Sequence, residues 1–155
     1  MKTKTLGLSL LLSIAASAIC FAGSNPTEGT WKLNESKSKF GEGMGKSTMV
    51  VWETAGENVK CTVDGVGADG NKTHTVWTGK LDGKDYAITG DATSDMRSFK
   101  LNDDKSIGMI SKKDGKTVGE GKIVVSADGK TRTVTNTMTN AKGEKVTTTG
   151  VYDKN

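Results

Sequence analysis

The stretch 106–140, SIGMISKKDGKTVGEGKIVVSADGKTRTVTNTMTN, decides the fold. Two Asp-Gly pairs, Asp114-Gly115 and Asp128-Gly129, interrupt segments in which Val, Ile and Thr alternate with polar residues. Asp-Gly between β-prone segments is a strong hairpin signal, because glycine adopts the positive φ that tight hairpin turns need. The stretch therefore predicts three consecutive antiparallel strands.

The same pattern extends along the rest of the chain, where further turn signals occur at Ala55–Asn58, Asp69–Asn71, Asp82-Gly83, Asn102–Asp104 and Lys142-Gly143. No segment of ten residues has a clear helical period. Strands joined by tight turns pair with their neighbours, and a long meander loses its two exposed edges only by closing on itself. We therefore predict an all-β, up-and-down antiparallel meander closed into an 8–10-stranded barrel. Its strands are expected at about 29–34, 48–54, 58–66, 73–81, 84–89, 96–102, 106–112, 117–126, 131–140 and 145–152.

The N-terminus has the three parts of a secretory signal. Two lysines precede an apolar segment, Leu6–Ile14, that is too short to span a bilayer, and small residues follow it. We expect cleavage after Ala22, with cleavage after Ala18 as the alternative, and a protein that resides in the periplasm or outside the cell. The predicted division is a signal peptide at 1–22 and a single barrel domain at 23–155.

Cysteine usage excludes an internal disulfide. Cys20 falls within the predicted signal and Cys61 remains alone, so stability must come from packing and strand pairing. Cys61 alternates with Val59 and Val63, which predicts a small buried side chain. A lipoprotein anchor is disfavoured, because Ile19 rather than a small residue precedes Cys20.

Charge and residue types argue against several function classes. The formal net charge is +4, and the lysines are interleaved with Asp and Glu, so we see no basic stripe with stacking aromatics for nucleic acid. His74 is the only histidine, and the carboxylates fall mainly in turns. We therefore predict a non-enzymatic protein with no catalytic residues, no metal site and no cofactor. No second hydrophobic segment predicts a membrane span, and we expect a monomer.

The first predicted strand opens with Gly29-Thr30-Trp31. This start resembles the Gly-x-Trp motif of the lipocalin-like (calycin) barrels, and the resemblance implies that Trp31 plugs the closed end of a barrel. The mature chain also looks like small exported bacterial proteins of the Gly-Thr-Trp-Lys-Leu-Asn type. Here the sequence departs from the family pattern: it ends three residues after Tyr152, without the helix that follows classical lipocalin barrels, and the connection 35–47 is too short for the helix pair of fatty-acid-binding barrels.

The two arginines carry the most specific signal for a ligand. Arg97 alternates with Phe99, and Arg132 alternates with Val134, so each guanidinium shares a sheet face with apolar side chains. If those faces point inward, the pair offers a clamp for a carboxylate or phosphate. Alternatively, Arg97 reaches solvent at the strand end, and Arg132 stacks on Trp31 as a cation–π contact, which the lipocalin resemblance favours.

The other candidates come from the same alternation and from the longest connection. Glu35–Ser47 contains three glycines around Met44, which is typical of a lid over a barrel mouth or of an ordinary mobile connection. The apolar residues predicted to face inward are Val50, Trp52, Val59, Cys61, Val63, Trp77, Tyr86, Ile88, Phe99, Met109, Ile123, Val134 and Met138. The candidate ligand-binding residues are Trp52, Trp77, Tyr86, Arg97, Phe99, Arg132, Phe40 and Met44.

Two function hypotheses remain open at this stage. The first is an exported lipocalin-like barrel that binds a small apolar or amphipathic molecule. The second is a structural or protein-interaction module of the cell envelope with a solid barrel core. A ten-stranded barrel is wide enough to enclose a ligand, whereas a narrow barrel is filled by its own side chains.

Overall fold

The computed structural model describes residues 25–140 and 143–155, so the predicted signal peptide, its cleavage sites and Cys20 lie outside the described residues. Within these residues the chain forms ten strands and one short 3₁₀ helix. All ten predicted strands are present, with ends that differ from the prediction by a few residues. The elements are β1 (Gly29–Leu33), η1 (Glu35–Lys37), β2 (Lys46–Ala55), β3 (Asn58–Val66), β4 (Lys72–Gly79), β5 (Tyr86–Thr89), β6 (Met96–Leu101), β7 (Ile107–Lys113), β8 (Lys116–Val125), β9 (Thr131–Thr139) and β10 (Lys145–Lys154).

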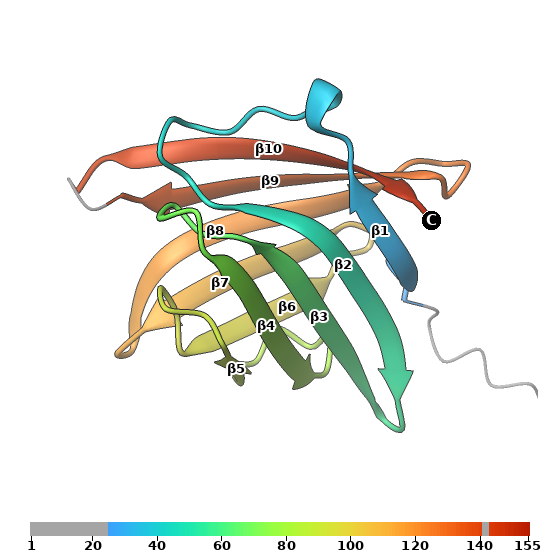
Figure 1. Cartoon of the computed structure of the whole chain (residues 1–155). Coiled ribbons are helices and arrows are strands. Elements are labelled where there is room, and N and C mark those ends of the chain that lie inside the picture. The colour runs from blue at the N-terminus through green and yellow to red at the C-terminus, as the bar shows by residue number, and fades with distance from the viewer. Residues whose placement is uncertain (1–24, 141–142) are drawn as a thin grey trace, which may run out of the picture.

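The strands form a closed barrel in which every strand pairs antiparallel with its neighbours in sequence. The barrel closes where β1 pairs with β10, with Trp31 opposite Lys154 and Leu33 opposite Tyr152, so the C-terminus lies beside β1 (Figure 1). The predicted all-β closed meander is therefore confirmed, with ten strands. β5 is the shortest strand, and it has two paired positions with each of its neighbours.

The Asp-Gly turns have the backbone that the sequence predicted. Asp114 and Gly115 have φ values of 49° and 75°, and Lys113 pairs with Lys116 across them. Two consecutive positive φ values between paired residues are the geometry of a type I′ hairpin, whose twist matches that of the strands. This local geometry fixes the register of β7 against β8.

The apolar core lies toward one end of the barrel, at the turns that join β2 to β3, β4 to β5, β6 to β7 and β8 to β9. The Phe99 ring packs edge-on against Trp52 and Trp77, with centroid separations of 5.0 and 4.7 Å. Trp31 is fully buried, and its indole Nε1 donates a 2.7 Å hydrogen bond to the carbonyl of Thr27 in the segment that enters β1. We call this half the aromatic end. Its buried members are Trp31, Trp52, Cys61, Trp77, Phe99, Ile107, Ile123 and Tyr152.

Candidate functional site

The other half of the barrel interior is lined by smaller and more polar side chains. They are identified by counting every second residue from a buried residue of the same strand, because side chains two residues apart on a strand share a face. We call this half the polar end. Its inward positions are Val63, Gly65, Thr73, Thr75, Ser111, Gly119, Gly121, Asn136, Met138, Val146, Thr148 and Gly150.

Contacts around two glycines of β8 confirm that this face points inward. A Cβ added at Gly121 would lie 2.8 Å from Met109 Cε and 3.3 Å from Asn136 Oδ1. At Gly119 it would lie 3.2 Å from Met138 Cγ. The neighbouring side chains therefore project over bare backbone, and the wall contributed by β8 is thin at the polar end.

Several inward side chains of the polar end keep partial contact with solvent. Val63, Thr75, Asn136, Met138 and Thr148 are only partly buried although they face the inside of a closed barrel. Inward residues of the aromatic end such as Trp52 and Trp77 are 1% exposed. Small inward side chains fill less of a ten-stranded barrel than large ones do, so the interior is less completely filled at the polar end.

Arg97 lies inside the barrel but already has anionic and polar partners. Its Nη2 donates a 2.8 Å hydrogen bond to Asp91 Oδ2, and its Nε donates a 3.1 Å bond to Ser111 Oγ. Burial favours a raised pKa for Asp91, but hydrogen bonds from Ser94 and Thr93 and the charge of Arg97 outweigh it, so that pKa lies below its usual value. Arg97 therefore fixes the β5–β6 connection to the barrel wall.

Arg132 is the second interior arginine, and its surroundings differ from those of Arg97. The side chain is 2% exposed, and its Cζ lies 5.5 Å from the ring centroid of Trp31 and 4.8 Å from that of Tyr152. The cation–π alternative is thus confirmed. Its Nε and Nη1 atoms are buried without a hydrogen-bond partner among the described residues. Burial lowers the pKa of Arg132 to about 10, so the group stays positively charged at neutral pH.

Cys61 is buried between strands as the sequence predicted. Burial raises the pKa of its thiol to about 12, and the positive charges of Arg132 and Arg97 oppose that shift only in part. A thiol with so high a pKa is neutral at physiological pH and a poor nucleophile. It acts here as a small apolar side chain of the core.

The predicted ligand-binding residues separate into three places. The Tyr86 ring packs edge-on against Trp77 at 5.8 Å, so these two residues belong to the aromatic end together with Trp52 and Phe99. The two arginines lie in the interior. Phe40 and Met44 lie apart from both groups, in the connection between β1 and β2.

That connection is fastened along part of its length. Backbone hydrogen bonds of 2.7 and 2.8 Å join Lys39 to Thr149 of β10, so the chain continues the pairing that β1 begins. Gly41 lies between Val146 and Met44, since an added Cβ would meet them at 3.0 and 3.3 Å. Whether residues 35–47 act as a lid stays a prediction.

Sequence reasoning missed Asp91 and Asn136. The carboxylate of Asp91 pairs with Arg97 from a connection that the sequence marks only as short and polar. Asn136 presents a buried Oδ1 without a partner on the same face of β9 as Arg132. The signal for Asn136 was available, because the even-numbered positions of β9 share the face of Arg132.

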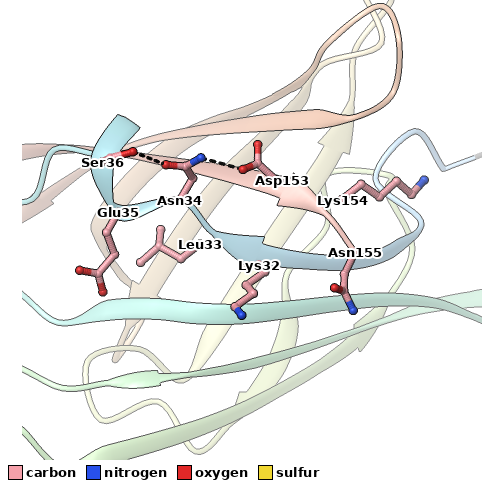
Figure 2. Close-up of a pocket in the computed structure, with 8 residues that line it drawn as sticks. All are labelled: Lys32, Leu33, Asn34, Glu35, Ser36, Asp153, Lys154 and Asn155. Atoms are coloured by element: carbon pink, nitrogen blue, oxygen red, sulfur yellow. Dashed lines mark hydrogen bonds between the residues drawn. The ribbon is translucent and has the colours of Figure 1, made fainter.

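Two hollows lie among the described residues. One, of about 390 Å³, lies where β1 passes into η1 beside the end of β10, and in Figure 2 the side chain of Asn34 stands between those of Ser36 and Asp153, to which it is hydrogen-bonded. The other, of about 420 Å³, includes His74, whose Nδ1 lies 2.6 Å from Asp64 Oδ1. The first is lined mainly by polar groups, whereas the second also includes Val66 and two inward positions of the polar end, Gly65 and Thr73.

Comparisons with known proteins found no matching family model, no matching curated protein and no matching solved structure. Among the described residues no helix is long and apolar enough to cross a membrane.

Proposed function

We propose that this protein is an exported, non-enzymatic carrier that binds a small apolar or amphipathic molecule through the polar end of its barrel. The observation that carries the proposal is the partial exposure of inward side chains such as Asn136 and Met138 within a closed barrel. Binding sites for small molecules combine an apolar lining with a few polar groups. The polar end offers Val63, Met138 and Val146 beside Thr75 and Asn136.

The division of the interior supports the same proposal. The aromatic end provides a packed floor, and the inward glycines of β8 and β10 are covered by the side chains of Met109, Met138 and Tyr152. The lipocalin resemblance adds a precedent for carriage inside a barrel. The Gly-Thr-Trp start and the meander are the features on which that likeness rests.

The test is binding of the neutral fluorophore N-phenyl-naphthylamine, whose emission rises in apolar surroundings. Gly119→Leu places a larger side chain on the inner face, and we expect it to reduce binding at least tenfold. Thr135→Leu adds the same side chain to the exposed outer face of β9 and should leave affinity unchanged. Equal binding by the two variants would move the fluorophore to the outer surface and contradict the proposal.

Native mass spectrometry of the protein from its own host tests the alternative function. A small molecule that co-purifies at one equivalent supports the carrier. A reproducible protein partner without any small molecule would favour the structural or interaction module of the cell envelope instead.

A further inference from the structure

We propose that Arg132 anchors the negatively charged head of the bound molecule, so that an amphipathic anion enters the barrel head first. This inference rests on the proposed carrier function and specifies the chemical class of the ligand. It narrows the sequence-based expectation, in which Arg97 and Arg132 together form a clamp for a carboxylate or phosphate.

The first argument is the charge balance of the interior. Arg97 is paired with Asp91 at 2.8 Å. Arg132 has no ion pair with any described carboxylate. The described interior therefore holds one positive charge that no protein anion neutralises.

The second argument is that the aromatic contacts of Arg132 do not supply hydrogen-bond acceptors for its N–H groups. The rings of Trp31 and Tyr152 attract the cation through their π faces. The N–H groups at Nε and Nη1 still lack acceptors. Buried donors without acceptors are costly, most of all on a charged group. A carboxylate is the acceptor that matches a guanidinium, since it can take two parallel N–H bonds.

The third argument is the position of Arg132 on the inner face of β9. Val134, Asn136 and Met138 follow Arg132 on that face and become partly exposed toward the polar end. Six residues at about 3.3 Å each cover about 20 Å of strand, which tilts by about 40° in such barrels, so Arg132 and Met138 are separated by roughly 15 Å along the barrel axis. An extended chain of about ten carbons would span this separation with its head at Arg132.

The experiment compares decanoate with decanol, which differ at the head group, as competitors for bound N-phenyl-naphthylamine. We expect wild-type protein to bind decanoate at least tenfold more tightly than decanol. Arg132→Met replaces the guanidinium with an uncharged side chain of similar length. It should weaken the binding of decanoate 10- to 100-fold and leave the affinity for decanol unchanged. Lys130→Met removes an equal charge from the exposed β8–β9 turn and should change neither affinity.

Each other outcome has a definite meaning. If decanoate and decanol bind wild-type protein equally, the carrier stands and the anionic anchor is overturned. If Arg97→Gln abolishes the preference for decanoate and Arg132→Met does not, the head lies at Arg97 and the inference is again overturned. If neither compound nor the fluorophore binds, the carrier function fails and this inference fails with it. If Arg132→Met does not fold, Arg97→Gln still decides: retention of the preference for decanoate supports Arg132 as the anchor, and its loss overturns the inference.

Discussion

The two ends of the barrel are built from the same alternating strands but differ in the side chains that face the interior. At the aromatic end, Trp52, Trp77 and Phe99 pack ring against ring and exclude water. At the polar end, the corresponding inward positions carry Gly, Thr, Ser and Asn, and several stay partly exposed. The comparison teaches that the tightly packed and the partly exposed parts of the interior are separated along the barrel axis. The aromatic end can hold the fold together while the polar end contributes less buried apolar area.

The largest expected effect is at the aromatic end. Trp31→Ala should cost about 3 to 5 kcal/mol, because it removes a fully buried ring and leaves a cavity beneath Arg132. Urea unfolding measures this loss. Met138→Ala, at the polar end, should cost less than about 1 kcal/mol because its side chain is already partly solvated. Equal costs would remove the distinction between the two ends.

Gly79 and Gly119 allow the packing at the two ends to be compared by adding one methyl group at each. A Cβ at Gly79 would lie 2.5 Å from Tyr86 Cγ and 2.7 Å from Trp77, so Gly79→Ala should cost about 1 to 3 kcal/mol. At Gly119 the nearest atom is a flexible Met138 carbon at 3.2 Å, and Gly119→Ala should cost less than about 0.5 kcal/mol. Thermal melts of the two variants give the comparison directly. A larger loss at Gly119 would mean that the polar end is the more tightly packed.

The Arg97–Asp91 pair allows a test by pH. Asp91→Asn should cost about 1 to 2 kcal/mol near pH 7, since it removes one charge of a largely buried pair. The folded-state pKa of Asp91 is below its usual value of 3.8. The contribution of ionised Asp91 to the free energy of unfolding is therefore complete above pH 3.8 and is lost as the pH falls through the folded-state pKa. The difference between wild type and variant should therefore shrink below about pH 4. A difference that is constant with pH would exclude the ionised pair as its cause.

The smallest expected effect concerns Cys61. The native protein should not react with the aromatic disulfide reagent DTNB over hours at pH 8, because the thiol is 5% exposed and burial raises its pKa to about 12. Protein unfolded in urea should react with one equivalent, counted on the mature chain. Fast labelling of the native state would show that reagent reaches Cys61 from the polar end.

The fold was largely predictable, because alternating polar and apolar residues indicate each strand and turn-forming residues indicate each hairpin. The candidate site was predictable only in part. Arg97 and Arg132 have the same local pattern, so their alternation cannot distinguish the guanidinium that meets Asp91 from the one that meets no carboxylate. That difference depends on the conformation of the β5–β6 connection and on the register of β9 within the barrel. The fastening of Lys39 to Thr149 likewise joins residues far apart in the sequence.

The pairing of β1 with β10 has a consequence for the order of folding. Trp31 pairs with Lys154 of β10, so the barrel cannot close before β10 has been synthesised. Contacts between distant parts of a chain also form slowly, because the loop entropy must be lost before they form. The pairing of β10 with β1 therefore also sets when the barrel can complete its folding.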